Sequence, residues 1–324
     1  MRLDNVEIEV IRGFDATLPL LYSLGWYERV SRKFEARGLP RGVYTFGPVA
    51  LTSGDIFSFF VRSVLRPQLD ELLVYPRIVP IEALKLPADM LLGDFKAAVR
   101  PLVTDPLRPL GTRAYQYGES ARFINWKATA RRRELQTRLF EPVANLQLYI
   151  VLNQETYGHV WEGIDTSALE LAISVAASIA QHAIELGYQT GLEVNAATRG
   201  MREAVREGSG YLFEHMRLPA SRNPEQLTRI LEALARIDGW GGMHQRDLLQ
   251  RVRYNLPMGA TMLLVTAVID DDALDEVAAM MRRGHPVAIV RVGNVGVPVS
   301  EIGGMRVHDI SGEDYRELES LAFD

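Results

Sequence analysis

Short apolar runs alternate with longer amphipathic segments from residue 146 to the end of the chain, and this alternation restricts the fold more than any other feature. The expected strands are residues 146–152, 191–197, 261–269, 287–292 and, at an edge, 305–310. The expected helices are residues 167–186, 224–237, 246–254, 271–283 and 313–321. Strands joined by helical crossovers form a mainly parallel, doubly wound sheet flanked by helices, so the fold class is α/β.

Capping residues mark where these helices begin. Ser167 and Glu170 have the spacing of a capping box, which predicts the start of the first helix. Asn223 precedes a proline and is expected to cap the second helix. Asp271 or Asp272 is expected to cap the helix that runs to residue 283.

Residues 1–60 have the pattern of a small antiparallel β-rich unit. Val6, Ile8 and Val10 alternate with acidic residues, which predicts a strand with one wet face. A second strand is expected over residues 29–36, and apolar positions from residue 43 to residue 51 continue the pattern.

Residues 61–110 are expected to form an irregular connecting arm, because prolines interrupt any long element there. These prolines are Pro67, Pro76, Pro80, Pro87, Pro101, Pro106 and Pro109. Residues 111–324 then form the α/β domain together with the segment that leads into it.

Composition limits the class of protein. A chain of 324 residues with 47% hydrophobic residues can bury a substantial core. The net charge of −5 does not suit a general nucleic-acid coat, and the absence of cysteine excludes disulfides and thiolate metal sites. No apolar run reaches the roughly 18–20 residues that span a bilayer. We therefore expect a cytoplasmic protein.

A basic segment at residues 111–141 is the best candidate for function, because it has a local charge of +4 in an acidic chain. Its candidate binding residues are Arg113, Glu119, Arg122, Trp126, Arg131, Arg132 and Arg133. Such a surface suits an acidic partner. A structural alternative remains open, in which Arg122 pairs with Glu119 and Trp126 fills the junction between the β unit and the sheet.

The same segment resembles a bacterial signature. The matching residues are Gly111, Arg113, Tyr115, Gly118, Glu119, Arg122, Ile124, Trp126, Ala130, Arg131 and Leu135. An upstream patch agrees at Arg41, Gly42, Tyr44, Gly47, Pro48, Asp55 and Phe57. Together they are similar to domain of unknown function (DUF) family 58. The resemblance implies a von Willebrand factor A-like domain behind a β-rich segment and a MoxR-type AAA+ ATPase as protein partner. It also implies two membrane helices at the start of the protein. Either these helices precede Met1 and associate the full-length protein with a membrane, or this member of the family lacks them.

The resemblance also implies a metal-ion-dependent adhesion site after the first strand of the sheet. In von Willebrand A domains an aspartate and two serines hold Mg²⁺ at that turn. Here the aligned residues are Asn153, Glu155 and Tyr157, and Ala267 stands near the place of a further aspartate. The turn offers one carboxylate, so we expect a degenerate site without a metal and no cofactor.

Two classes of function remain open. The first is a noncatalytic protein-interaction or scaffold protein that works with a MoxR-type ATPase. The alternative is a metal-assisted hydrolase built on Glu155 and the nearby Asp270, Asp271 and Asp272, or a phosphate or nucleic-acid binder that uses residues 111–141. The chain has no H-E-x-x-H motif, phosphate-binding loop or nucleophile elbow. The sequence therefore nominates no catalytic residue.

Overall fold

A computed structural model gives the fold of the chain, which divides into two compact units, Met1–Tyr75 and Pro76–Asp324. The structure describes residues 21–23, 25–31, 39–46, 48–55, 57, 59–84, 104–116, 121–142, 147–157, 163–196, 215–237, 239, 242–293, 301–302, 305–311 and 321–323.

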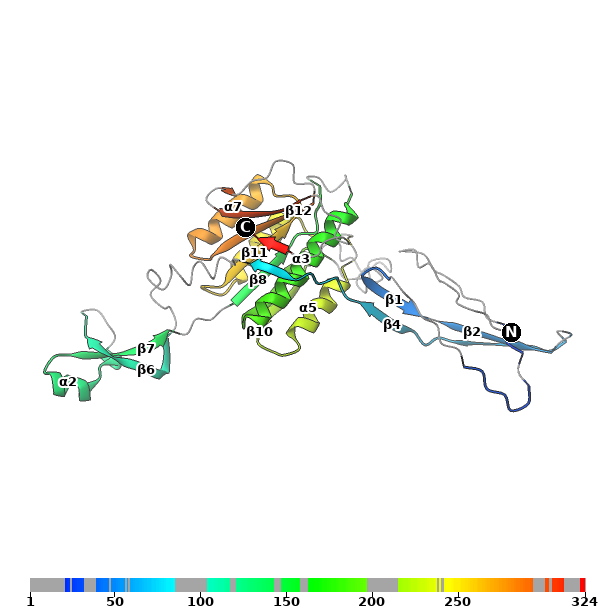
Figure 1. The fold of residues 1–324 in the computed structure, drawn as a ribbon, viewed down its shortest axis with the longest axis horizontal. Coiled ribbons are helices and arrows are strands. Elements are labelled where there is room, and N and C mark those ends of the chain that lie inside the picture. The colour runs from blue at the N-terminus through cyan, green and yellow to red at the C-terminus, as the bar shows by residue number, and fades with distance from the viewer. Residues whose placement is uncertain are drawn as a thin grey trace. The chain divides into compact units, whose positions relative to one another are not determined.

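In the described part of the first unit, the strands pair as two antiparallel ribbons (Figure 1). Strand β1 (Gly42–Phe46) pairs with β4 (Asp70–Val74), and β2 (Val49–Gly54) pairs with β3 (Val61–Arg66). The expected β-rich unit is confirmed in these strands. The strand expected at Val6 to Val10 and most of residues 29–36 lie outside the described residues.

The irregular arm expected over residues 61–110 is wrong where β3, β4, β5 (Ile81–Leu84) and β6 (Thr104–Ala114) form. Pro67 directly follows β3 and Pro80 directly precedes β5, so these prolines lie just outside the strands and do not interrupt them. Pro109 lies inside β6, where the pairing with β7 (Gln136–Pro142) shifts register on either side of it. A strand accommodates proline at such an irregularity because no ladder hydrogen bond is lost there.

The second unit contains a seven-stranded sheet in the order β10-β9-β8-β11-β12-β14-β13. The strands are β8 (Gln147–Leu152), β9 (Gln189–Val194), β10 (Met216–Ser221), β11 (Thr261–Thr266), β12 (Val287–Gly293), β13 (Glu301–Ile302) and β14 (Met305–Ser311). All pairings from β9 to β14 are parallel, and β10 and β13 add antiparallel strands at the edges. The expected α/β class with a mainly parallel sheet is confirmed, but β14 is not an edge strand.

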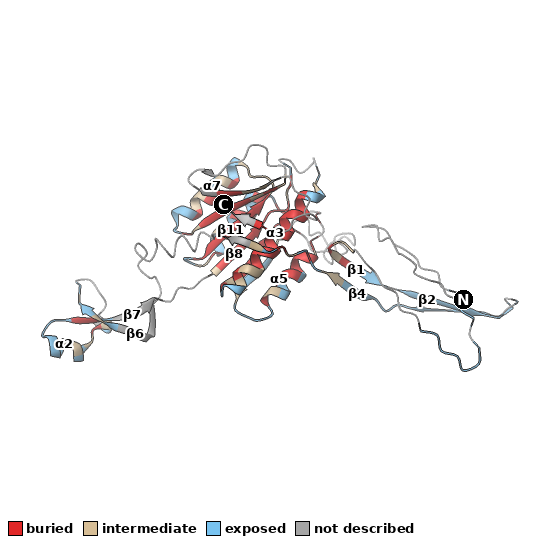
Figure 2. Ribbon diagram, viewed as in Figure 1, coloured by how far each residue is buried: buried red, intermediate tan, exposed pale blue. Residues whose placement is uncertain are grey.

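Helices cover both faces of the sheet (Figure 1). Helices α3 (Thr166–Glu185) and α5 (Gln226–Ala235) pack with Leu148, Ile150 and Leu152 on one face. Helices α6 (Gln245–Asn255) and α7 (Asp271–Arg282) pack with the alternate side chains of the same strands on the other face. Figure 2 shows that the buried residues concentrate in the strands and in α3. The sheet is therefore covered on both sides, as its apolar strands predict.

The helices begin at residues other than the expected caps. Asp165 caps α3, because its Oδ1 accepts the N–H groups of Ser167 and Ala168, so the capping box predicted there is wrong. Asp270 caps α7 through the N–H of Ala273, with Asp271 and Asp272 in the first turn. Helix α5 begins after Glu225 without a side-chain cap, and Asn223 instead accepts the N–H of Glu225.

The segment before the signature region is attached to the α/β unit. Strand β5 pairs in parallel with β15 (Leu321–Phe323), and the N–H of Val79 donates to the Ser178 hydroxyl of α3 at 2.9 Å. The final helix expected over residues 313–321 lies outside the described residues except for Leu321, which begins a strand. In the described chain, α3 alone is long and apolar enough to cross a membrane, and most of it is buried in the core.

Candidate functional site

Three loops converge where the sheet reverses its winding. The chain leaves β8 toward β9 on one side and later adds β11 on the other side, so the carboxyl ends of β8 and β11 lie at the switch point. Ligands of doubly wound sheets bind at such a point. Here it holds Asn153 after β8, Thr266 at the end of β11 and Asn195 after β9, and all three side chains are buried.

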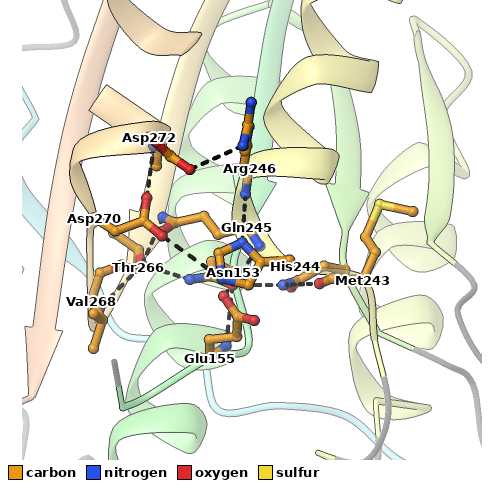
Figure 3. A network of polar contacts seen from close by, with 12 residues as sticks. Asn153, Glu155, Met243, His244, Gln245, Arg246, Thr266, Val268, Asp270 and Asp272 are labelled. Carbon is orange, nitrogen blue, oxygen red and sulfur yellow. Dashed lines mark hydrogen bonds and ion pairs between the residues drawn. The ribbon is translucent and has the colours of Figure 1, made fainter. Parts of the chain in front are cut away.

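The amide of Asn153 is held by neighbours on both sides (Figure 3). Its Nδ2 donates to the Thr266 hydroxyl at 3.0 Å, and its Oδ1 accepts from Asn195 Nδ2 at 2.6 Å and from the Glu155 N–H at 3.2 Å. The Thr266 hydroxyl also accepts from Gln245 Nε2 and donates to the carbonyl of Val268. Both lone pairs of the amide oxygen are thus used in hydrogen bonds within the protein.

A second set of contacts fixes the loop after β8 to the loop after β9. The N–H of Gln154 donates to Asn195 Oδ1 at 2.8 Å, and Gln154 Nε2 donates to the Asn195 carbonyl at 2.7 Å. Gly242 lies against this pair so closely that an added Cβ would be 1.7 Å from the Asn195 carbonyl oxygen and 2.3 Å from Gln154 Nε2. Only glycine fits there without a shift of the loop.

Glu155 is the half-buried carboxylate of the site. Its Oε2 accepts the N–H of Gln245, the first residue of α6, at 3.2 Å (Figure 3). Burial raises the pKa of the Glu155 carboxyl, and the carboxylates of Asp270 and Asp247 add to the rise, while His244 and the Gln245 N–H oppose it. The helix N-terminus therefore stabilises the ionised carboxylate against the cost of burial.

The aspartates after β11 have partners of their own. Asp270 caps α7, and its Oδ2 lies 3.8 Å from His244 Nε2. Asp272 forms an ion pair with Arg246 at 3.1 Å. These contacts are those of a helix cap and a surface ion pair, the structural roles that compete with metal ligation by the same residues.

Few oxygens at this site are free to ligate a divalent cation. Mg²⁺ needs closely spaced, unengaged oxygens in a near-octahedral arrangement, whereas the oxygens of Asn153 and Thr266 already serve the network. Within the described ranges, no three His, Cys, Asp or Glu side chains converge to hold a metal ion. Tyr157 is 44% exposed at the surface, and Ala267 has a methyl side chain without an oxygen to offer a cation.

Sequence reasoning placed Asn153 and Glu155 at this edge but missed Asn195, Gly242 and Gln245, which complete the network. Asn195 was not predicted as a site residue because the strand was expected to run through residue 197, whereas β9 ends at Val194. A buried-strand pattern followed by a polar residue is the only signal that could have indicated it.

The signature segment forms a hairpin of β6 and β7, with a 3-10 turn (Ala121–Phe123) and helix α2 (Trp126–Arg132) between the strands. Asn125 caps α2 through the N–H of Ala128 at 3.2 Å, and Arg133 ends the helix in the left-handed conformation at φ 58°. The Thr129 hydroxyl accepts the N–H of Gln136 at 3.0 Å. These bonds fix α2 on the hairpin.

The candidate binding residues of the hairpin that the structure describes are exposed. They are Arg113, Arg122, Trp126, Arg131, Arg132 and Arg133, whereas Glu119 lies outside the described residues. The Trp126 side chain is 67% exposed. The Arg122 guanidinium lies 4.5 Å from the centre of the Phe123 ring, a cation–π contact that orients it.

Comparison with known proteins agrees with the signature. The model of a protein family described as "Protein of unknown function DUF58" matches residues 111–321. The uncharacterized protein YeaD of Bacillus subtilis (strain 168) is 24% identical over 193 residues, which are 59% of this chain and 45% of that protein. The match thus spans less than half of the relative's length.

A solved structure, that of an aerotolerance-related membrane protein from Bacteroides fragilis NCTC 9343, is 12% identical and superimposes with a TM-score of 0.32. The superimposed region covers 50% of this chain and 76% of the Bacteroides fragilis chain. The family match covers well over half of the chain and includes both the hairpin and the sheet. The chain therefore belongs to the DUF58 family of proteins of unknown function.

Proposed function

We propose that this protein is a noncatalytic interaction protein that binds an acidic partner through the hairpin of β6, β7 and α2. The observation that carries the proposal is the 67% exposure of Trp126 on a fixed helix whose neighbouring arginines are also exposed. Tryptophan and arginine are the residues that most often dominate binding energy at interfaces. A large aromatic side chain left in water beside cations is costly unless a partner covers it.

The switch point supports a noncatalytic role. We propose a von Willebrand factor A-like sheet in which the metal-ion-dependent adhesion site is degenerate, and the strand order with one antiparallel edge strand next to β9 is compatible with it. Asn153 replaces the aspartate that such a site requires, and its amide joins β8 to the loops after β9 and β11. The residues at this position therefore tie loops together, which favours binding elsewhere on the chain.

The partner we propose is a MoxR-type AAA+ ATPase, which the DUF58 resemblance implies. The test is capture of such an ATPase on immobilised protein, with wild type compared with Trp126→Ser and with Arg132→Glu combined with Arg133→Glu. Each variant changes exposed side chains, so we expect capture to fall about tenfold or more at an unchanged melting temperature. Arg229→Glu on α5 is the matched control, because Arg229 is exposed and lies in a different element.

Two results would refute the hairpin surface: equal capture by both variants, or loss of capture by the Arg229 control. Binding of an oligonucleotide or of inorganic phosphate that is lost in the arginine variants would favour the phosphate or nucleic-acid alternative. The hairpin charges would then serve phosphate and not carboxylate groups.

A metal-assisted hydrolase remains a second candidate, because Glu155 has a raised pKa and lies beside His244 and Asp270. Calorimetric titration with Mg²⁺ and Mn²⁺ separates the two proposals. The interaction protein gives no saturable heat, and Glu155→Ala leaves the titration unchanged. A saturable heat that disappears in Glu155→Ala would favour the hydrolase.

A further inference from the structure

A second exposed surface lies at the opposite edge of the sheet from the switch point. Helices α6 and α7 pack against each other and end where β11 and β12 begin, so their last turns lie together at the amino edge. We call the surface formed by residues 251–260 and 280–286 the amino-edge patch. All of its residues are described by the structure.

The amino-edge patch is basic. Its two segments contain Arg251, Arg253, Arg282 and Arg283 and no aspartate or glutamate, in a chain whose net charge is −5. One nearby carboxylate, Glu276 of α7, pairs with Arg253 at 3.1 Å. Arg251, Arg282 and Arg283 add positive charge beyond this pair.

The amino-edge patch also exposes apolar side chains among these charges. Tyr254 is 67% exposed and Met258 is 79% exposed, and Met281 of α7 is 36% exposed. Tyrosine, methionine and arginine are enriched at the cores of protein interfaces, whereas phosphate recognition gains nothing from methionine. The combination favours a protein segment over a nucleic acid.

The aromatic side chain is held in place before any partner binds. The guanidinium of Arg253 lies 5.0 Å from the centre of the Tyr254 ring, and that of Arg283 lies 5.8 Å from it. Arg283 also donates to the Arg253 carbonyl at 3.3 Å, which joins the ends of the two helices. Because the ring and both cations are already ordered, less conformational entropy is lost on binding.

We propose that the amino-edge patch is a docking site for an acidic segment of a protein partner that carries a leucine or aromatic residue among its carboxylates. The apolar residue packs on Tyr254 and Met258, and the carboxylates pair with Arg282 and Arg283. Charge complementarity selects this occupant, because the amino-edge patch offers cations and no competing carboxylate in its own segments. The proposal is independent of the hairpin and adds a second contact surface to the chain.

The test is selection of a displayed library of random 12-residue peptides on the immobilised full chain, followed by fluorescence polarisation of the enriched peptides. We expect enrichment of peptides that combine Asp or Glu with Leu, Phe or Trp. Their affinity should fall about tenfold in Tyr254→Ser and in Arg282→Glu combined with Arg283→Glu. Arg229→Glu and the hairpin variant Trp126→Ser should bind them as the wild type does.

Four outcomes would overturn the proposal. They are no enrichment, enrichment of neutral or basic peptides, acidic peptides that bind the patch variants equally, and duplex DNA binding or self-association that depends on Tyr254 and Arg283. Arg283→Gln removes the charge and also the bond from Arg283 to the Arg253 carbonyl, so its melting temperature is measured together with its peptide binding. A variant with unchanged melting temperature and weakened peptide binding supports the charge contact.

Discussion

Introducing a carboxylate at the switch point tests whether the Asn153 amide has a structural role. In Asn153→Asp, an oxygen replaces Nδ2 and faces the Thr266 hydroxyl oxygen, to which Nδ2 donates at 3.0 Å. The hydroxyl can turn to the carboxylate only by releasing the Val268 carbonyl. One buried hydrogen bond is lost and a buried charge is added, so we expect a loss of about 3 kcal/mol in the free energy of unfolding at pH 7.

Urea denaturation measures this loss, which corresponds to about 1 M in the midpoint at a slope near 3 kcal/mol per M. The matched control is Asn223→Asp, because the Asn223 side-chain oxygen accepts the Glu225 N–H at an exposed turn and a carboxylate accepts it equally well. The difference in the free energy of unfolding between the wild type and Asn153→Asp should become smaller in acid. The introduced carboxyl group, once protonated, can donate to the Thr266 hydroxyl as the amide does. Millimolar Mg²⁺ should not restore stability.

Two results would refute this reasoning. If Asn153→Asp were as stable as the wild type at pH 7, the amide network would not hold the loops together. If Mg²⁺ restored the lost stability, one carboxylate would be enough to complete a metal site, and the remaining ligands would be better placed than their hydrogen bonds suggest.

Three further changes test the packing around the sheet. Gly242→Ala should destabilise the unit by about 3 kcal/mol in urea, because its Cβ would overlap the Asn195 carbonyl. Ser178→Ala should cost about 1 kcal/mol and increase amide hydrogen exchange at Val79, which loses its acceptor. Burial, opposed by a neighbouring arginine, raises the pKa of Glu193 from 4.5 to about 7. The folded state therefore binds more protons at Glu193 than the unfolded state does. The contribution of Glu193 to the free energy of unfolding is complete below pH 4.5 and falls by up to about 3 kcal/mol as the pH rises to 7. Glu193→Gln should lack that decline in urea midpoints between pH 5 and 7.

The sequence predicted the centre of the sheet because β8, β11 and β12 are nearly continuous apolar runs, and such runs are stable when helices cover both of their faces. Helix ends were predicted less well. Asp165 lies two residues before Ser167, and either residue has a suitable side chain for a cap. The choice depends on where the backbone leaves the preceding loop, and the Asp165 N–H is fixed by the distant Thr156 hydroxyl at 2.7 Å. The residues around the helix start do not predict that contact with Thr156.

The candidate site shows the same division between local and distant information. Asn153 and Glu155 follow from the position of one strand end, because ligand sites of such sheets lie after the strands. Asn195 and Gln245 come from elements 42 and 92 residues later in the chain, and only the strand order brings them to Asn153. Gly242 is still less predictable, since its role is the space that it leaves unfilled.

Internal hydrogen bonds between loops separate the switch point from the two proposed docking surfaces. At the switch point, a ligand would have to displace bonds that join β8, β9 and β11, which costs about 1 kcal/mol or more for each bond that is not replaced. Trp126 and Tyr254 are exposed instead, each on a helix whose end is fixed by hydrogen bonds. Covering either side chain releases water from apolar surface without breaking an internal bond. The energetics therefore favour partner binding on the hairpin and the amino-edge patch, with the switch point acting to hold the sheet's loops in one arrangement.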